Sequence, residues 1–293
     1  LACKSPKLLV PAMNTQMYEN PVTQDNLALC EKYGYKIIEP SVGHLACGDS
    51  GKGKMAEPDE ILKHIIFEIG EKKDLSGKKI VVTAGPTQEA IDPVRFITNH
   101  SSGKMGYAIA ERAACRGAEV VLVSGPANIE PPLFVKKIGV VSAKEMFEAV
   151  KSEYENADIV IKAAAVADYR PKNVSSEKIK KFDGELAIPL ERTDDILKYL
   201  GEHKKRQFLC GFSMETQNMI ENSKAKLEKK NLDMVVANNL KVKGAGFGGD
   251  TNVVTLITRD SVKEFPVMTK NQVADVILDE ILKSLNGFAS RCV

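Results

Sequence analysis

The strongest constraint on the fold is a regular alternation of short β-branched runs with helix-length amphipathic segments, which begins near residue 78. Strands that alternate with helices at this spacing favour right-handed βαβ units. We therefore expect an α/β fold with a doubly wound, mostly parallel sheet that is covered on both faces. The expected strands are 79–84, 119–124, 158–163, 207–212, 233–237 and 253–258, the last with a hairpin partner at 262–267, and the expected helices are 104–115, 143–154, 194–204, 215–230 and 271–285.

The first seventy or so residues are organised differently. Short apolar runs at 7–10 and 35–38 predict two strands, with a helix over 21–33 between them. A second helix is expected from Pro58, because proline suits the first helical position. The apolar stripe of that helix, over 61–69, predicts one buried face.

A charged and glycine-containing stretch at 70–77 separates the two patterns. Such a change of composition is typical of a linker. A length of 293 residues also leaves room for about two domains. We therefore divide the chain into residues 1–74 and 75–293.

The composition excludes several function classes. The 41 Lys and Arg residues against 39 Asp and Glu residues give a formal net charge of +2, which gives no reason to expect a nucleic-acid or membrane-surface partner. No uncharged apolar run approaches the roughly 18–20 residues that cross a bilayer, and no signal peptide is recognisable. The six cysteines form no CxxC pair and no metal-ligand spacing, as expected for a reduced, cytoplasmic protein.

A candidate anion site follows the first strand of the long α/β segment. Strand 79–84 runs into Gly85 and Pro86, and a Ser/Gly-rich turn at 99–106 opens the next helix. Ligands of open parallel sheets bind beyond the carboxyl ends of the strands, and a helix N-terminus offers free N–H groups to an anion. The turn is neither a GxGxxG fingerprint nor a P-loop. Helix capping and phosphate binding therefore both stay open at this point.

A second candidate site lies at the end of strand 158–163, where small residues lead to Asp168. Small side chains let a ligand approach the backbone. Asp168 can hydrogen-bond a sugar, a base edge or a metal ion, or it can simply cap a helix. Two groups of lysines suit a polyphosphate, although such groups are more often solvated faces. They are Lys178, Lys180 and Lys181, and Lys226, Lys229 and Lys230.

In the first segment, Asn14 follows a predicted strand, and a glycine-rich flap at 43–55 surrounds Cys47. Glycines on both sides allow such a loop to fold over a ligand and to bring in the thiol as an acid or nucleophile. A single cysteine is more often an inert core residue, but four glycines make a poor core. We expect Cys47 to be functional and the other five cysteines to be structural.

Together these segments resemble the bacterial family of bifunctional phosphopantothenoylcysteine decarboxylase/phosphopantothenate–cysteine ligases of coenzyme A biosynthesis. Residues 11–17 resemble the PxMNxxM motif of the decarboxylase, and residues 45–55 resemble its flap. Further segments match the ligase half in the same order, at 83–87, 92–95, 98–106, 164–169 and 178–181. The resemblance implies a Rossmann-like ligase domain preceded by the C-terminal part of a flavodoxin-like decarboxylase domain.

For the ligase half, the resemblance implies that the carboxylate of 4′-phosphopantothenate attacks the α-phosphate of CTP, with Mg²⁺ assisting. The amine of L-cysteine then displaces CMP from the acyl-cytidylate. Lys178 is expected to hold the triphosphate and promote activation, and Asn99, with Arg95 and Ala165, to bind the phosphopantothenoyl group. The positions implied to contact CTP are Ala163, Ala164, Asp168, Lys178, Asp194, Asp195, Ile196, Leu197, Phe212, Lys226 and Lys230. Lys162 is an unusual charge beside them, and the metal ligands stay unassigned.

For the decarboxylase half, the resemblance implies FMN chemistry, with Asn14 contacting the substrate carboxylate and Cys47 donating a proton. The family's first flavin-binding strand, glycine-rich turn and catalytic histidine have no counterpart in this sequence, so we expect an N-terminally truncated decarboxylase domain with an incomplete flavin site. The family also implies a homodimer through the ligase domain. The alternative is a non-catalytic oligomerisation or regulatory module on a flavodoxin-like scaffold.

Overall fold

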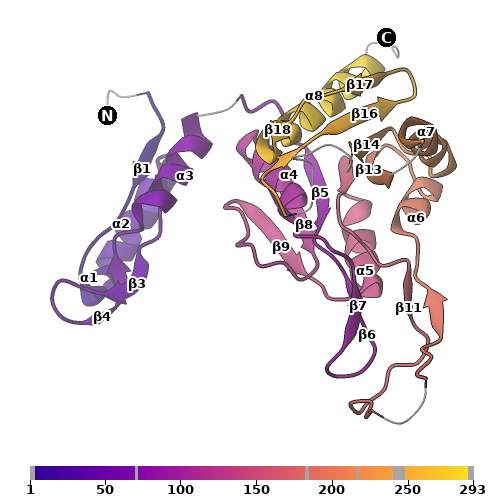
Figure 1. The fold of residues 1–293 in the computed structure, drawn as a ribbon. Coiled ribbons are helices and arrows are strands. Elements are labelled where there is room, and N and C mark those ends of the chain that lie inside the picture. Colours follow the sequence, from indigo (N-terminus) through magenta and orange to yellow (C-terminus); the bar gives the residue numbers. More distant parts are fainter. Residues whose placement is uncertain (1–3, 70–71, 182–184, 216–217, 240–247, 290–293) are drawn as a thin grey trace. The chain divides into compact units, whose positions relative to one another are not determined.

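The computed structural model describes residues 4–69, 72–181, 185–215, 218–239 and 248–289 (Figure 1). The chain forms two compact units, Leu1–Lys72 and Lys73–Val293. Each unit has its own secondary structure and is considered by itself. In the described parts of both units, no helix is long and apolar enough to span a bilayer.

The first unit contains a small parallel sheet, a hairpin and three helices. Strands β1 (Lys7–Leu9) and β2 (Tyr35–Ile37) pair in parallel, and β3 (Ser41–His44) and β4 (Ser50–Lys54) form an antiparallel hairpin. The helices are α1 (Thr15–Glu19), α2 (Pro21–Lys32) and α3 (Pro58–Ile69). The strands at 7–10 and 35–38, helix 21–33 and the start at Pro58 are thus confirmed within one residue at each end.

Local sequence explains where α2 begins and ends. The side chain of Asn20 accepts a hydrogen bond from the backbone N–H of Val22 at 2.9 Å, and Pro21 occupies the first helical position. After the helix, Gly34 adopts φ +83°, a left-handed conformation that glycine reaches without strain. The helix boundaries therefore follow from residue types alone.

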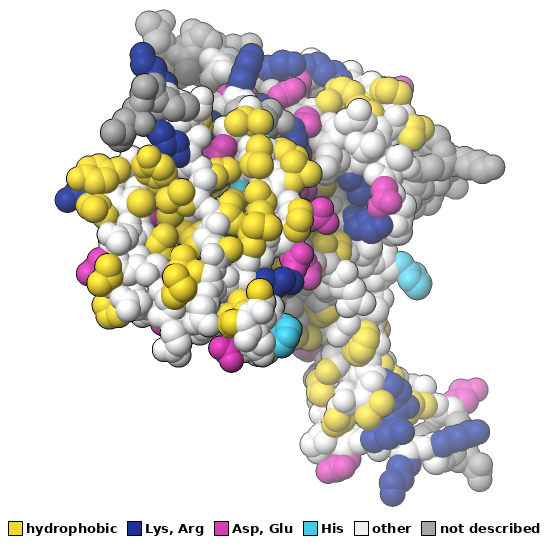
Figure 2. Space-filling model, turned by 90° about the vertical axis from the view of Figure 1, so that its left-hand side faces the viewer, with side chains coloured by type: hydrophobic (Ala, Val, Ile, Leu, Met, Phe, Trp, Pro, Cys, Tyr) yellow, Lys and Arg dark blue, Asp and Glu magenta, His cyan; other side chains and the backbone are white. Residues whose placement is uncertain are grey.

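The apolar stripe of α3 is not buried within the first unit, contrary to the sequence prediction. A two-stranded sheet offers too little surface to cover two helices, and neither α2 nor α3 has a fully buried residue. Hydrophobic side chains gather on the face of the molecule shown in Figure 2. The exposed apolar residues of α2 and α3 include Val22, Leu29, Leu62, Ile65, Ile66 and Ile69.

The second unit is built on an eight-stranded sheet with the order β17-β16-β14-β13-β10-β5-β8-β9. Pairing is parallel from β9 to β14 and antiparallel for β14–β16 and β16–β17. The predicted doubly wound, mostly parallel sheet with an antiparallel hairpin at one edge is confirmed. The strands are β5 (Lys79–Ala84), β8 (Glu119–Ser124), β9 (Val135–Gly139), β10 (Ile159–Lys162), β13 (Phe208–Glu215), β14 (Met234–Asn239), β16 (Val254–Thr258) and β17 (Val262–Glu264).

Helices cover both faces of this sheet (Figure 1). On one face, α4 (Lys104–Cys115) packs against β5, β8 and α8 (Lys270–Ala289). On the other face, α5 (Ala143–Tyr154), α6 (Ile196–Glu202) and α7 (Met219–Lys229) enclose a core with members such as Val81, Met146 and Leu209. Every residue of β5 after Lys79 is buried, so the sheet is a rigid base for whatever its loops carry.

Three small two-stranded ribbons and one edge strand were not predicted. Strand β9 contains two exposed lysines at an edge of the sheet, so it lacks the apolar signal of a central strand. The ribbons have strands of only two or three residues, too short to show a period. They pair β6 (Gln88–Ala90) with β7 (Phe96–Thr98), β11 (Tyr169–Pro171) with β12 (Leu190–Arg192), and β15 (Thr251–Asn252) with β18 (Met268–Thr269).

Candidate functional site

The strand order reverses between β5 and β10, because β8 and β9 lie on one side of this pair and β13 and β14 on the other. Such a switch point opens a crevice at the carboxyl ends of the strands. The loops that leave the two strands are joined there. The backbone N–H of Ala165 donates to the carbonyl of Gly85 at 3.0 Å, and that of Thr87 donates to the carbonyl of Ala165 at 3.3 Å.

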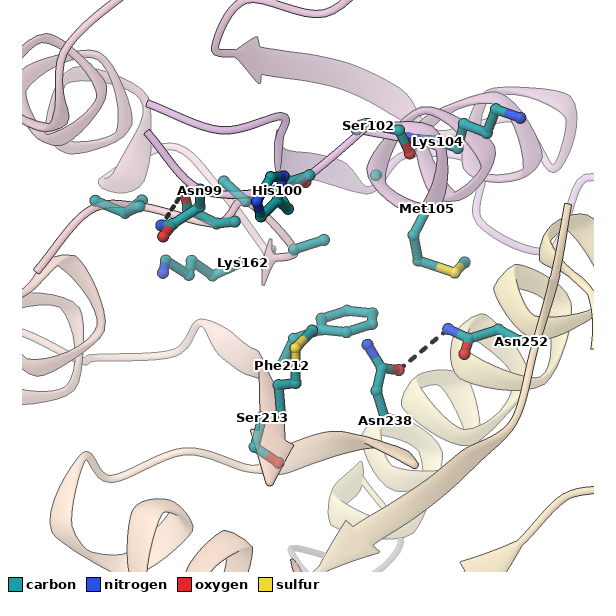
Figure 3. A pocket seen from close by; sticks show the side chains of 18 of the residues that line it. Asn99, His100, Ser102, Lys104, Met105, Lys162, Phe212, Ser213, Asn238 and Asn252 are labelled. Carbon is teal, nitrogen blue, oxygen red and sulfur yellow. Dashed lines mark hydrogen bonds between the residues drawn. The ribbon is translucent and has the colours of Figure 1, made fainter. Parts of the chain in front are cut away.

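A cavity of about 610 Å³ occupies this position (Figure 3). We call it the first cavity. Its walls come from the turn before α4, the ends of β10, β13, β14 and β15, and the start of α8. Residues that lie far apart in the sequence therefore converge on one space. Its volume is within the roughly 300–1,000 Å³ of small-molecule sites.

Two glycines shape the wall beside α4. Gly103 precedes the helix with φ +79° and has no side chain to cap the exposed N–H groups. Gly106 lies against the end of β5, where a Cβ atom would come within 2.5 Å of the Cβ of Ala84. The helix N-terminus is thereby held against the sheet with N–H groups available to an anion.

The first cavity carries an excess of positive charge. Among the described residues that line it, Lys104, Lys162, Lys226 and Lys270 oppose one carboxylate, Asp168. Burial lowers the pKa of Lys162 to about 8; the charges of Lys226 and Lys230 act in the same direction, while those of Asp195 and Asp168 oppose them. An anionic ligand would stabilise the charged form of a lysine held in this way.

A second cavity, of about 820 Å³, shares four lining residues with the first. The shared residues are Lys162, Val166, Asp168 and Lys226. The second cavity extends to the N-terminus of α6, where Asp195 accepts a hydrogen bond from the backbone N–H of Lys198 at 3.1 Å. The two cavities therefore adjoin at these shared residues.

Asp195 also pairs with Lys230, whose ammonium lies 2.8 Å from a carboxylate oxygen. Burial alone would raise the pKa of Asp195, but the hydrogen bonds from Lys230 and from the backbone of Lys198 lower it below its ordinary value. This side of the second cavity is therefore a fixed ion pair next to a helix N-terminus.

Most residues implied to contact CTP or the phosphopantothenoyl group line one or both cavities. Asn99, Ala163, Ala164, Ala165, Asp168, Phe212 and Lys226 line the first. Asp168, Asp194, Asp195, Ile196, Leu197, Lys226 and Lys230 line the second. Arg95 and Lys178 line neither.

Asp92 explains where Arg95 and Lys178 lie instead. The guanidinium of Arg95 binds the buried carboxylate of Asp92 and also donates to the carbonyl of Ile179 at 2.6 Å. The backbone N–H of Ile179 donates to the same carboxylate at 3.1 Å. Burial raises the pKa of Asp92, but these hydrogen bonds hold it well below its usual range. The exposed Lys178 is thus attached to the turn that contains Asp92, outside the two cavities.

In the first unit, the structure brings Asn14 and Cys47 into contact. The amide of Asn14 donates to the sulfur of Cys47 at 3.2 Å, while its oxygen caps α1 by accepting from the N–H of Gln16 at 2.8 Å. The thiol of Cys47 lies 3.6 Å from the carboxylate of Asp49, and Cys47 is exposed. Two residues that stand 33 positions apart thus form one polar cluster.

The flap that carries Cys47 is the β3–β4 hairpin, and its glycines have a packing role that the sequence did not reveal. Gly53 adopts φ +147°, and a Cβ atom there would lie 2.2 Å from the carbonyl oxygen of Met13. The backbone N–H of Met13 donates to the carbonyl of Gly53 at 3.0 Å. Glycine is required because the hairpin packs directly against the segment that holds Asn14.

Comparison with known proteins identifies the family. A family profile described as "DNA/pantothenate metabolism flavoprotein C-terminal domain" matches residues 75–285, and one described as "Flavoprotein" matches residues 1–70. The coenzyme A biosynthesis bifunctional protein CoaBC of Bacillus subtilis is 51% identical over 285 residues, which are 96% of this chain and 70% of that protein. The chain belongs to the CoaBC family.

Two further relatives extend this result. A protein named cysteine/cysteine sulfinic acid decarboxylase, from an unknown prokaryotic organism, is 46% identical over 96% of this chain and 80% of its own length. The crystal structure of the C-terminal domain of a CoaBC protein superposes with a TM-score of 0.64 at 51% identity, over 74% of this chain and all of that one. The resemblance stated from the motifs is confirmed, and so is the α/β fold.

Three lining residues of the first cavity lie outside every segment that the sequence of this CoaBC family member singled out. They are Asn238, Asn252 and Lys270. Asn238 follows the apolar run 233–237, so the rule that drew attention to Asp168 at a strand end also applies to it. Asn252 and Lys270 lie in or beside a short ribbon, where no sequence signal marks them.

The described residues offer no ready-made metal cage, since no three His, Cys, Asp or Glu side chains among them group in a way that could hold an ion. Mg²⁺ is commonly bound by one or two carboxylates together with substrate phosphates. Asp168, which lines both cavities, is a carboxylate in a suitable position for such a role.

Proposed function

We propose that this chain ligates 4′-phosphopantothenate to L-cysteine in a CTP-dependent reaction, through an acyl-cytidylate, with release of pyrophosphate and CMP. The observation that carries this proposal is the first cavity: a positively charged pocket at the switch point of a parallel sheet, which shares four lining residues with the second cavity, in a CoaBC family member. We assign the reaction to residues 75–293.

In the first step, a carboxylate oxygen of 4′-phosphopantothenate attacks the α-phosphate of CTP, and pyrophosphate leaves. Negative charge on the transferring group requires converging positive charge. Lys162 and Lys226 line both cavities, so we place the transferring phosphate between these two side chains. Mg²⁺ supplies further charge neutralisation when bound, and Asp168 is the residue we propose to contact it.

In the second step, the amine of L-cysteine attacks the acyl carbon, and CMP leaves as a good leaving group. Asn99 lies on the wall of the first cavity with its amide N–H donating to the carbonyl of Ala165 at 3.1 Å. We propose that Asn99 binds the phosphopantothenoyl group. The roles of Arg95 and Lys178 stay predictions, because both lie outside the cavities.

The test is nucleotide turnover by the purified chain. CMP and pyrophosphate should form from CTP only when 4′-phosphopantothenate is present, and the amide product should require L-cysteine. Replacing CTP by ATP should lower the rate. Absence of CMP under these conditions would falsify the proposed ligation, and a chain that also fails to bind CTP would favour the alternative of a non-catalytic module.

A second candidate function, FMN-dependent decarboxylation of the ligation product, is favoured by one observation in residues 1–74. Asn14 and Cys47 are in contact, as a substrate carboxylate binder and a proton donor should be. FMN supplies the redox chemistry when bound. We assign to this unit only the contacts of Asn14 and Cys47 with the substrate, and we assign no flavin contact. A flavin absorbance band in the purified protein would support this function. A Cys47→Ser variant tests the proton donor, because it should no longer form the decarboxylated product.

A homodimer through the second unit completes the proposal. Light scattering on the purified chain should give twice the chain mass of 32.0 kDa. A monomeric mass with full ligase activity would contradict the homodimer alone.

A further inference from the structure

Two asparagines on one wall of the first cavity form a hydrogen-bonded chain with a defined direction (Figure 3). The backbone N–H of Val253 donates to the side-chain oxygen of Asn252 at 2.9 Å. The side-chain nitrogen of Asn252 then donates to the side-chain oxygen of Asn238 at 3.1 Å. Asn252 is only 6% exposed, so its amide is held in place by the surrounding protein.

The direction of this chain fixes which group Asn238 presents. An asparagine amide has one acceptor end and one donor end, and its orientation follows from its partners. Because a backbone N–H can only donate, Asn252 must turn its oxygen toward Val253 and its NH₂ group toward Asn238. The oxygen of Asn238 is thereby occupied, and its NH₂ group is the end that remains for the cavity.

Figure 3 shows the nitrogen of Asn238 on the side of Phe212, while its oxygen faces Asn252. Asn238 is half-buried and lies at the end of β14, so a ligand in the cavity can reach it. The natural partner of this NH₂ group is a hydrogen-bond acceptor.

The charges on the same wall indicate what kind of acceptor. Lys270, the first residue of α8, is only 7% exposed and donates to the carbonyl of Gly249. Lys104 reaches the neighbouring loop, where its ammonium lies 2.7 Å from the carboxylate of Asp250. Donors and ammonium groups concentrated in this way suit phosphate oxygens better than the neutral carbonyl of a base or an amide.

We propose that Asn252 is a positioning residue: it orients Asn238 so that the Asn238 amide donates to a phosphate oxygen of the nucleotide, and Lys270 contributes charge to the same phosphates. This inference rests on the proposed use of a nucleoside triphosphate. It assigns the departing pyrophosphate to this wall, and it gives a role to a residue that does not touch the ligand.

The experiment is isothermal titration of the full chain with inorganic pyrophosphate and, separately, with CMP. Asn238→Ala and Asn252→Ala should each weaken pyrophosphate binding roughly tenfold, the effect of losing one hydrogen bond to a charged group. The double variant should be no weaker than Asn238→Ala alone, because Asn252 acts only through Asn238. Binding of CMP should change less than about twofold in all three, since CMP lacks the β- and γ-phosphates.

Lys270 is tested with a matched charge control. Lys270→Met should weaken pyrophosphate binding roughly ten- to hundredfold, as for a charged hydrogen bond lost from a partly buried site. Lys144→Met removes the same charge from an exposed position on α5 and should leave the affinity unchanged.

Several results would overturn the inference. The inference is wrong if Asn238→Ala binds pyrophosphate with the affinity of the parent, or if the losses of the two single variants add in the double variant. It is also wrong if the variants lose equal affinity for CMP and for pyrophosphate, or if the parent binds no pyrophosphate. If Asn252→Ala fails to fold, Asn238→Ala still decides, because Asn238 is only half-buried. A parent that binds pyrophosphate as expected but forms no CMP would refute the proposed ligation and leave the positioning role standing. A parent that ligates normally while the variants bind pyrophosphate like the parent would refute the inference alone.

Discussion

The second unit carries its candidate residues on the loops of an eight-stranded sheet with buried central strands, whereas the first unit carries Asn14 and Cys47 on a two-stranded sheet and a hairpin. The cavities of the second unit are lined by residues from at least six elements that share one core. The cluster of the first unit depends on close backbone contacts between two neighbouring segments. The core of the second unit thus positions the proposed ligase residues, and chemistry in the two units should be separable by mutation.

Lys178 should show the largest effect. Lys178→Gln is expected to lower phosphopantothenate-dependent CMP formation roughly 100- to 1,000-fold, the range for loss of one charge that stabilises a transition state. Cys47→Ser, in the other unit, should leave this rate unchanged. Steady-state CMP release measures both. If Lys178→Gln forms CMP at the rate of the parent, Lys178 stays outside the cavities during catalysis and does not contact the triphosphate.

The difference in burial predicts a contrast in stability. Leu122→Ala removes a fully buried side chain from β8 and should lower the free energy of unfolding of the second unit by about 2–5 kcal/mol. Leu62→Ala removes a side chain that is 53% exposed on α3 and should change stability by less than about 0.5 kcal/mol. Urea denaturation measures both. Equal losses would mean that α3 is buried in solution.

Asn99 tests the second chemical step. In Asn99→Asp, the carboxylate cannot donate to the carbonyl of Ala165, so the side chain should leave its present orientation. We expect consumption of the acyl-cytidylate to slow roughly tenfold while its formation is less affected. Rapid-quench measurement of the intermediate distinguishes the two steps. Equal slowing of formation and consumption would assign Asn99 to nucleotide activation instead.

The smallest expected effect is a dependence on pH. Lys162 has its pKa lowered from 10.5 to about 8, with Lys226, Lys230, Asp195 and Asp168 as the charged groups around it. The charged form binds an anion, so raising the pH from 7.5 to 9 should weaken CTP binding, by at most about tenfold as the protonated fraction falls. Lys162→Met should flatten this slope. If CTP affinity falls with pH equally in the parent and in Lys162→Met, Lys162 does not bind the nucleotide.

The elements with a regular spacing of apolar residues were predicted from the sequence, and the elements without such a spacing were missed. Strand 79–84 and helix 104–115 were placed to the residue. A strand buried on both faces gives a continuous apolar run, and a helix packed on a sheet gives an apolar period of 3.6 residues. The hairpin of β3 and β4 was predicted to be a loop, since two of its glycines, Gly51 and Gly53, serve close packing rather than flexibility. The buried stripe expected on α3 was wrong within this unit, because the pattern shows that a face is apolar but not what covers it.

The family resemblance implied roles for Asp168 and Phe212, and both residues lie at the cavities. Asp168 follows β10 and lines both cavities, and Phe212 lies within β13 and lines the first. Their contact with CTP stays a prediction. Lys178 and Arg95 were expected at the ligand, but both lie outside the cavities. Arg95 binds Asp92, and Asp92 also accepts from the backbone N–H of Ile179, the neighbour of Lys178, across 87 positions. Asn252 and Lys270 are brought to the wall by tertiary structure alone. Contacts of this kind leave no mark on local sequence.

The most direct test of the central claim is mass spectrometry of the chain incubated with CTP, Mg²⁺ and 4′-phosphopantothenate, with L-cysteine left out. We predict that a phosphopantothenoyl-cytidylate accumulates together with pyrophosphate, and that L-cysteine then converts it to the amide and CMP. Intact CTP, or CMP released equally with and without 4′-phosphopantothenate, would contradict the account.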